Sequence, residues 1–466
     1  MASLPPRRWL LRGALALAVG ALVLAAAVSA ATYEPTNLGP GTVDSPANGS
    51  TVVSVQGFHF QGIGNGKKPA RLVSAGPRGT TDWVHNGSEQ GARWFYDVDP
   101  LSNGNLLVTS TVPGDTVVYE FDPENRTRVW SQRFDAEDTH DVDLINGDQL
   151  LVANMRRTND SGVPNDRLFV YDRSEDRIVW EWTFRKHFPE STDGGYSADW
   201  SHVNDVDKVG EGKYLASPRN FDQAIVVDRA SGNVTMRLGS DGNHSRLFEQ
   251  HNPDYLEGPN GTPTILVADS ENDRVVEYAR TGPGEWNRTW ELSGGFNWPR
   301  DADRLPNGNT LITDTLNQRV LEVTPRGEVV WEYYAPWAPY DSERPSAANT
   351  SVSQNASVGG SHGPTVAEMN ATGSYTLSGS SESGLATQTS FSTWVAATAA
   401  GTPVQDIVQP AAERYSHIVP FVRPVWLSSW AFAALVGALA LALVWALGEI
   451  IYQRRHIRRR VGRTLP

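Results

Sequence analysis

The sequence predicts an all-β fold, a six-bladed β-propeller, with an apolar segment near each end of the chain. Short runs rich in Val, Ile, Tyr and Trp recur through the central part, and Asn-Gly or single Gly turns separate them. The repeating unit is about 40 to 50 residues long, which is typical of propeller blades, whose radial packing hides most strand edges. A large side chain recurs toward the end of each unit, at Trp83, Trp130, Trp180, Met236, Trp290 and Trp331. This count predicts six blades, and seven blades are the alternative.

The chain begins with a segment suited to export or membrane insertion. Arg7, Arg8 and Arg12 precede the apolar run 13–31, which ends in small residues. This layout is typical of a signal peptide, and a membrane anchor is the alternative for residues 1–31. We expect the propeller at residues 50–345, where the first unit is truncated. The strand that completes it is expected either at Val52-Val53 or in the later segment 375–377.

The C-terminal part of the chain differs in composition. Residues 346–424 are rich in Ser, Ala, Thr, Gly and Asn, and they hold few large apolar side chains. We therefore expect a stalk or linker, in which ordered strands remain an open alternative. Residues 425–452 are long and apolar enough for a membrane-spanning helix, and the Arg-rich tail 453–466 follows directly. Because basic residues favour the cytoplasmic side, we expect a cytoplasmic tail and an extracytoplasmic propeller at the cell membrane.

Composition narrows the partners and the chemistry. The formal net charge is -13 and no basic stripe is present, so nucleic acid is not an expected partner. An acidic, lysine-poor composition also resembles that of halophile proteins. The chain has no Cys, which excludes disulfides, thiolate metal sites and cysteine nucleophiles. Asn-x-Ser/Thr sequons between Asn48 and Asn370 exceed the roughly four expected by chance, and they predict glycosylation of an exported domain.

One position recurs in register across five of the units. A polar or aromatic residue there precedes a short stretch containing Asp, a Gly-marked turn and a β-rich run. Because the innermost strand of each blade lines the central channel, these side chains should form one ring at one mouth of the channel. The predicted members are Tyr96, His140, Asn204, His251 and Arg300. His202 lies two residues before Asn204 and so points the same way in a strand, and Arg219 ends the following strand near the same mouth.

This set of side chains favours an anionic ligand. Three histidines, an asparagine and one or two arginines can together donate hydrogen bonds to a group with several oxygens. A glycosidase is a weaker hypothesis, because the Asp residues beside the ring positions are better explained as ligands of turns.

Four short segments resemble the active-site segments of the arylsulfate sulfotransferases. They are Thr139-His140-Asp141, His202-Val203-Asn204, Ser217-Pro218-Arg219-Asn220 and Gln250-His251-Asn252. Members of that family are secreted six-bladed propellers that move a sulfuryl group between phenols without a nucleotide donor. The resemblance covers residues 96–331 and depends on the order and spacing of the motifs. It implies that His251 is the nucleophile, that His140, His202 and Arg219 stabilise charge on the sulfuryl oxygens, and that Asn204 orients the group.

The resulting hypothesis is a membrane-tethered, extracytoplasmic sulfotransferase. The donor would be an aryl sulfate ester, the acceptor a phenol or a glycan hydroxyl, and no cofactor or metal is expected. A neutral imidazole is a competent nucleophile near neutral pH, so the transfer would be ping-pong through a sulfohistidine. Tyr96 and Arg300 are expected to bind substrate, and both His140 and Tyr96 are candidates for protonating the departing phenol.

Two other classes of function stay open. In a metal-dependent propeller hydrolase or lyase, His140, His202 and His251 would bind one cation through imidazole nitrogens. In a non-catalytic propeller the same residues would line a surface binding module.

Overall fold

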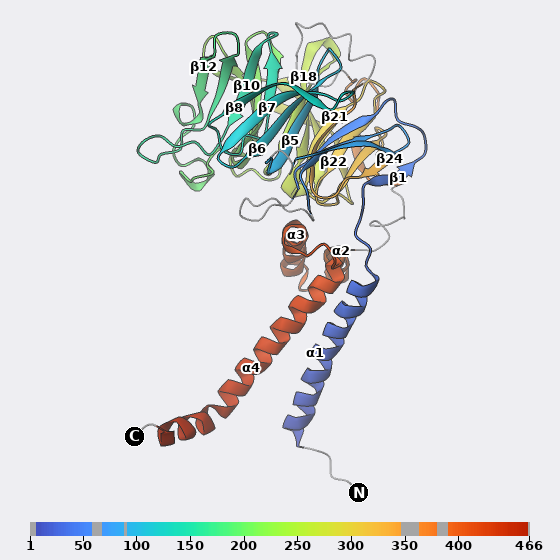
Figure 1. Cartoon of the computed structure of the whole chain (residues 1–466), viewed down its shortest axis with the longest axis vertical. Helices are drawn as coiled ribbons and strands as arrows, with labels where there is room; N and C mark the ends of the chain where they lie inside the picture. Colours follow the sequence, from blue (N-terminus) through green and yellow to red (C-terminus); the bar gives the residue numbers. More distant parts are fainter. Residues whose placement is uncertain (1–5, 58–67, 88–90, 346–362, 380–389, 465–466) are drawn as a thin grey trace. The chain divides into compact units, whose positions relative to one another are not determined.

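The computed structural model describes residues 6–57, 68–87, 91–345, 363–379 and 390–464. The chain divides into two compact units. One comprises Thr36–Thr387 and contains the strands, and the other combines Met1–Pro35 with Gln388–Pro466 and contains the α-helices (Figure 1).

The strand-containing unit is a six-bladed β-propeller, which confirms the predicted fold and blade number. Five blades are formed by four consecutive strands, with the innermost strand first. The first two of these blades are β5 (Trp94–Pro100), β6 (Leu106–Val112), β7 (Asp115–Asp122) and β8 (Thr127–Phe134), and then β9 (Val142–Ile145), β10 (Gln149–Asn154), β11 (Arg167–Asp172) and β12 (Arg177–Thr183). The next two are β13 (Val203–Gly210), β14 (Lys213–Pro218), β15 (Gln223–Asp228) and β16 (Val234–Gly239), and then β17 (His251–Gly258), β18 (Thr262–Asp269), β19 (Arg274–Gly282) and β20 (Glu285–Ser293). The fifth is β21 (Pro299–Arg304), β22 (Thr310–Asp314), β23 (Arg319–Val323) and β24 (Val329–Tyr334).

The remaining blade closes the ring with strands from both ends of the propeller. Its outer strands are β2 (Thr51–Val55), β3 (Arg71–Ala75) and β4 (Thr81–Asn86), and its innermost strand is β25 (Pro339–Glu343). Val53 pairs with Ser342 across the closure. The truncated first unit is thus completed at Val52-Val53. The alternative segment instead supplies β26 (Gly373–Thr376), which adds in parallel to the outer strand β20, and β1 (Gly39–Val43) adds in the same outer position to β24.

Apolar faces of neighbouring blades form the core. Leu151 and Val170 of one blade, for example, share a cluster with Ala216 and Ile225 of the next. These four side chains are fully buried. Each buried Val, Leu or Ile adds about 1.5–3 kcal/mol to the free energy of unfolding relative to an exposed side chain. The alternation of core and channel-facing residues along the inner strands is what directs the polar register toward the axis.

Carboxylates on or just before the inner strands link several blades to their neighbours. Asp141 Oδ2 accepts a hydrogen bond from the backbone N–H of Val206 at 2.6 Å, and Asp341 Oδ2 accepts one from Val98 at 3.0 Å. Asp301 Oδ2 accepts from the N–H of Ser342 at 3.1 Å. These residues directly follow the polar register. Their carboxylates therefore cross-link blades, and the expectation that these Asp residues satisfy turns is wrong for these three.

The second unit is helical. It contains α1 (Arg7–Thr32), α2 (Phe391–Ala399), α3 (Gln405–Val422) and α4 (Ser429–Thr464). By length and composition, Arg7–Thr32 and Ser429–Arg454 are each apolar enough to cross a membrane. The segment 346–424, for which we expect a stalk, includes β26, α2 and α3, while its parts 346–362 and 380–389 lie outside the described residues.

Candidate active site

All five predicted ring residues lie at or just before the starts of inner strands, and their side chains come together near the propeller axis. The ring centroids of Tyr96 and His140 are 3.8 Å apart, and those of His140 and His202 are 5.2 Å apart. Asn204 Nδ2 donates to the carbonyl oxygen of Gln250, the residue before His251, at 3.0 Å. The structure therefore brings together residues that are far apart along the chain.

Sequence reasoning missed the sixth member, Tyr340 of β25. Its ring centroid is 5.0 Å from that of Tyr96 and 5.9 Å from that of His251, and the guanidinium carbon of Arg300 lies 4.7 Å from it. The stretch Tyr340-Asp341-Ser342-Glu343 repeats the polar register, so a signal was present. It lies beyond the last complete unit, and only closure of the first blade moves it to the axis. We call Tyr96, His140, Asn204, His251, Arg300 and Tyr340 the axial ring; every member is at most 5% exposed.

The backbone bends in a similar way before most axial-ring positions. Two residues earlier, the φ angle is positive in five of the six blades, at Asp138, His202, Glu249, Trp298 and Ala338. The pairing register also shifts at the ring position in five inner strands, as between His251 and Asp254. Such bulges re-aim a side chain, and strained φ values persist where the surrounding structure enforces them. The positive φ angles and register shifts recur at these positions, and they turn the ring side chains toward the propeller axis.

His251 holds its hydrogen on Nδ1. This atom lies 3.1 Å from the carbonyl oxygen of Glu249, which can only accept, and 2.8 Å from Ser270 Oγ, at the start of η6 (Ser270–Asn272). The hydroxyl of Ser270 itself donates to the carbonyl oxygen of Pro299 at 2.7 Å. Nδ1–H is therefore the donor toward both oxygens, and Nε2 carries the lone pair. His251 Nε2 is buried and has no hydrogen-bond partner among the described residues.

The surroundings of His251 keep its imidazole neutral. Burial lowers the pKa of His251 well below its usual value, and the nearby positive charges of Arg300 and Arg219 lower it further. The combination of a neutral ring, a fixed tautomer and a free Nε2 is what a nitrogen nucleophile requires.

His140 is held between an acid and a tyrosine. Its Nε2 lies 3.7 Å from Asp138 Oδ1, and its Nδ1 lies 2.8 Å from Tyr340 Oη. Burial would raise the pKa of Asp138, but His140 and Arg156 lower it to about 2, and Tyr96 Oη also donates to this carboxylate. Burial lowers the pKa of His140 to about 4. A neutral His140 with Nε2–H toward the ionised Asp138 accepts the hydroxyl hydrogen of Tyr340 at Nδ1.

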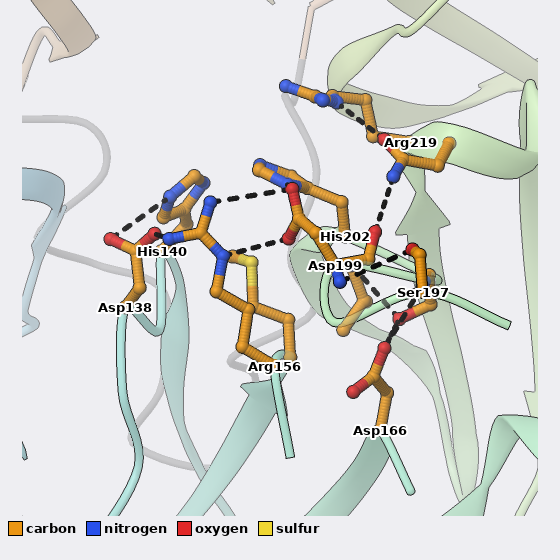
Figure 2. A network of polar contacts seen from close by, with 12 residues as sticks. Asp138, His140, Arg156, Asp166, Ser197, Asp199, His202 and Arg219 are labelled. Atoms are coloured by element: carbon orange, nitrogen blue, oxygen red, sulfur yellow. Dashed lines mark hydrogen bonds and ion pairs between the residues drawn. The ribbon is translucent and has the colours of Figure 1, made fainter. Parts of the chain in front are cut away.

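A second acid–histidine pair lies beside the first, and Arg156 connects the two (Figure 2). His202 Nδ1–H donates to Asp199 Oδ2 at 2.8 Å, and Arg156 Nε donates to Asp199 Oδ1 at the same distance. Arg156 Nη1 also donates to Asp138. Burial lowers the pKa of His202 to about 3, with a further contribution from the charge of Arg219. Asp138, Asp199 and Arg156 were missed because they lie in loops outside the register.

The two predicted arginines differ in their partners. Arg219, at the start of η4 (Arg219–Phe221), is partly buried and forms an ion pair with Glu249 at 3.2 Å. Arg300 is buried between Trp298 and Tyr340, and its Nη1 donates to Gln56 Oε1 at 2.6 Å. Among the described residues, no carboxylate lies within ion-pair distance of Arg300, and its Nε has no hydrogen-bond partner. A buried cation in this state favours an anionic ligand.

The carboxylates on and beside the inner strands carry less negative charge at neutral pH than their number implies. Burial raises the pKa of Asp143 to about 6, that of Asp301 to about 7 and that of Asp141 to about 8. Because neighbouring carboxylates repel one another, several stay protonated at neutral pH. Because these carboxylates are partly protonated, they repel an anion near the propeller axis less strongly.

The described residues contain no group of three or more His, Asp or Glu side chains arranged to hold a metal ion. His140 also directs its Nδ1 to Tyr340 Oη and its Nε2 toward Asp138, so both of its ring nitrogens face protein oxygens. The metal-dependent alternative, which needs His140, His202 and His251 on one cation, has no support in this geometry.

Fold and side chains together define a β-propeller with neutral histidines and two arginines gathered near its axis. Residues 78–256 of the chain match the model of the arylsulfotransferase (ASST) family. The match confirms the predicted resemblance and spans Tyr96, His140, His202, Arg219 and His251, whereas Arg300 and Tyr340 lie beyond it. This family suggests arylsulfotransferase activity, with an aryl sulfate donor and a hydroxyl acceptor.

The other comparisons support no conclusion about this chain. No curated protein matches the chain. Similar solved structures include a protein of unknown function from Bacteroides caccae (12% identity, 64% of this chain and 98% of that chain, TM-score 0.44). Another is a catalytically inactive variant of virginiamycin B lyase from Staphylococcus aureus with quinupristin (11% identity, 65% and 87%, TM-score 0.38). Because both TM-scores are below 0.5, we base no argument on these structures.

Proposed function

We propose that the propeller transfers a sulfuryl group from an aryl sulfate ester to an acceptor hydroxyl in two steps through His251. The observation that carries this proposal is the free, buried Nε2 of a neutral His251 beside Arg300, a buried cation without a carboxylate partner among the described residues. The family match supports the substrate class.

In the first step, the Nε2 lone pair of His251 attacks sulfur, and the bond between sulfur and the aryl oxygen breaks. The electron pair leaves with the aryl oxygen, which takes a proton to become the phenol. Tyr340 and Tyr96 both keep their hydroxyl hydrogens at neutral pH, because burial raises the pKa of each well above its usual value. Tyr340 is the better-placed acid for this step, because it contacts both His251 and His140.

In the second step, the acceptor hydroxyl attacks sulfur and loses its proton, and the N–S bond breaks to restore neutral His251. The imidazole of His202 is suited to take that proton at Nε2, because Asp199 holds its Nδ1–H and stabilises the imidazolium that forms. The proton then returns from His202 to the oxygen of Tyr340, which gave up its own in the first step, so both groups regain their starting state. Because donor and acceptor react in turn with one enzyme group, the kinetics are expected to be ping-pong.

Charge on the sulfuryl oxygens is balanced by fixed cations and donors. The positive charges of Arg300 and Arg219 are both close enough to His251 to lower its pKa, so both would also attract the sulfuryl oxygens of a group bound there. The side-chain amide of Asn204 completes the set from the neighbouring blade. Donors that are already oriented in a buried site stabilise developing charge without reorganisation, which is commonly the largest catalytic contribution.

We propose that this activity is extracytoplasmic and tethered to the membrane through α4. The Arg-rich residues after α4 would lie in the cytoplasm, and the sequons would be exported with the propeller. The propeller at 50–345 and the stalk at 346–424 remain our proposed division of the chain, and a phenol or a glycan hydroxyl remains the proposed acceptor.

The test is incubation of the full chain with a chromogenic aryl sulfate, with and without a phenol acceptor, followed by intact-mass analysis. We expect a one-sulfuryl mass increase on His251 that disappears when the phenol is added. His251→Ala should abolish both the adduct and phenol release, whereas His187→Ala, which alters a ring stacked on Trp182 away from the site, should retain both. Transfer without an adduct, or an adduct that persists in His251→Ala, would overturn the proposal.

A further inference from the structure

We propose that α1 is retained in the mature protein and forms a two-span membrane anchor with α4, joined by an ion pair between Arg12 and Glu449. The sequence leaves residues 1–31 as either a signal peptide or an anchor. The contacts between the two helices, which belong to one compact unit, favour the anchor.

The first argument is that each helix carries one charge that the other neutralises. Glu449 is the acidic residue within the apolar stretch of α4, and an ionised side chain at membrane depth is costly unless it is paired. Arg12 Nε donates to Glu449 Oε1 at 2.6 Å, and Arg12 Nη2 donates to the other carboxylate oxygen. The Arg12 side chain is only 22% exposed, whereas the neighbouring Leu11 is 62% exposed. A forked pair of this kind satisfies both charges.

The second argument is that the two charges lie at matching depths. Arg12 lies 20 residues before the end of α1 (32 − 12), and Glu449 lies 20 residues after the start of α4 (449 − 429). At about 1.5 Å per residue both lie about 30 Å from the other end of the helix pair, which is the thickness of the hydrocarbon core. The ion pair would thus lie near one membrane surface.

The third argument is that the opposite ends of the helices also match. Ser29 Oγ and Ser428 Oγ are 2.7 Å apart, and Ala26, Leu427 and Ala431 form a buried cluster. Small residues let membrane helices approach closely, and hydroxyl pairs add polar contacts between them. Contacts at both ends define one antiparallel register over the whole length.

The charge distribution agrees with this topology. Arg7 and Arg8 lie at the same end of the pair as Arg454, so both termini would face the cytoplasm. Cleavage near the small residues 28–30 would remove α1, and it would leave Glu449 without its partner at the edge of the hydrocarbon core. Because Arg12 of α1 neutralises Glu449 of α4, we expect α1 to be retained in the mature protein.

The test uses the absence of Cys from the chain. We expect the double variant Ser29→Cys/Ser428→Cys, expressed at full length in membranes, to form an intramolecular disulfide, detected as a linked peptide in a non-reduced digest. The matched control is Val28→Cys/Ser428→Cys, because Val28 is 56% exposed on an outer face of α1. We also expect the intact mass of the mature protein to correspond to a chain that begins at residue 1 or 2.

The ion pair is tested in the same cross-linking assay. Arg12→Glu should lower the disulfide yield at least severalfold, and the swapped variant Arg12→Glu/Glu449→Arg should restore it. A mature protein that begins near residue 30, or equal cross-linking in the two Cys pairs, would overturn the proposal. These outcomes are independent of sulfuryl transfer, since they do not measure activity.

Discussion

The Nδ1–H of His251 donates to Ser270 Oγ at 2.8 Å, and the hydroxyl of Ser270 is in turn committed to the carbonyl oxygen of Pro299 at 2.7 Å. This relationship decides which imidazole nitrogen is free. Ser270 lies at the end of the second strand of its blade, and Pro299 begins the next blade. Packing between two blades therefore sets the tautomer of the proposed nucleophile.

Replacing Ser270 by Ala should slow sulfuryl transfer without abolishing it. The carbonyl oxygen of Glu249 still accepts from Nδ1 at 3.1 Å, so one neutral hydrogen bond of about 1 kcal/mol is lost. That energy corresponds to a rate lower by about five- to tenfold. Steady-state kinetics should show the effect in kcat, with Ser231→Ala on an outer turn as the control. An unchanged kcat would mean that Ser270 does not orient His251.

Adduct formation should persist at mildly acidic pH. The pKa of His251 is well below its usual value, and that of His202 is lowered to about 3, so both imidazoles stay neutral as the pH falls through 6.5. A group with a lowered pKa loses its neutral form only below that pKa. Single-turnover rates measured from pH 5 to 8 should therefore be nearly flat. A decline centred near pH 6.5 would contradict this assignment.

Arg156→Gln should shift the acid limb of the pH profile upward. Arg156 balances the carboxylates of Asp138 and Asp199, and its charge helps to lower the pKa of His140. Without it, both carboxylates favour the protonated histidines more strongly, so the pKa values of His140 and His202 should rise. We expect about a tenfold loss of activity near pH 5 and a smaller loss at pH 8. The adjacent Arg157→Gln is the matched control, and equal losses at both pH values would indicate a purely structural role.

Tyr340→Phe should discriminate among donors by leaving group. The variant keeps the ring that packs near Arg300 and His251 but removes the hydroxyl that bonds to His140 Nδ1. Poor leaving groups need more proton donation, so phenyl sulfate should slow more than nitrophenyl sulfate, by about tenfold or more. Tyr333→Phe, whose hydroxyl contacts Thr81, serves as control. Equal slowing for the two donors would exclude Tyr340 as the acid.

The propeller should lose stability as the pH rises from about 4 to about 8. The folded-state pKa values of Asp143, Asp301 and Asp141 are raised to about 6, 7 and 8, so the folded state binds more protons than the unfolded state across this window. Their contribution to the free energy of unfolding is present at low pH and is lost as the pH passes through these values.

Asp205→Asn should relieve part of this loss. Burial raises the pKa of Asp205, neighbouring carboxylates raise it further, and its Oδ2 has no hydrogen-bond partner among the described residues. We expect Tm at pH 8 to rise by about 2–4 °C, with little change at pH 4.5. Thermal unfolding followed by circular dichroism checks both values. Asp228→Asn, on an outer turn, is the control, and equal shifts at both pH values would refute the explanation.

The sequence by itself determined the repeating β pattern, the six blades and five axial-ring residues. This succeeded because blade repeats place the same register position at the same height on the axis, so His140, Asn204 and His251 could be aligned without coordinates. The four motifs gave the family resemblance for the same reason, and the match over residues 78–256 confirms it.

Only the tertiary structure decided the rest. Tyr340 joins the axial ring because β25 closes a blade whose other strands lie near the opposite end of the propeller sequence, and no local pattern records that pairing. Asp138, Asp199 and Arg156 reach the histidines from irregular loops, where side-chain direction depends on packing. Nε2 of His251 is free because the Ser270 hydroxyl donates its hydrogen to the carbonyl oxygen of Pro299, which leaves Ser270 Oγ to accept from Nδ1–H. Register is periodic along the chain, whereas closure, loop packing and proton placement arise from contacts between residues that are distant in sequence.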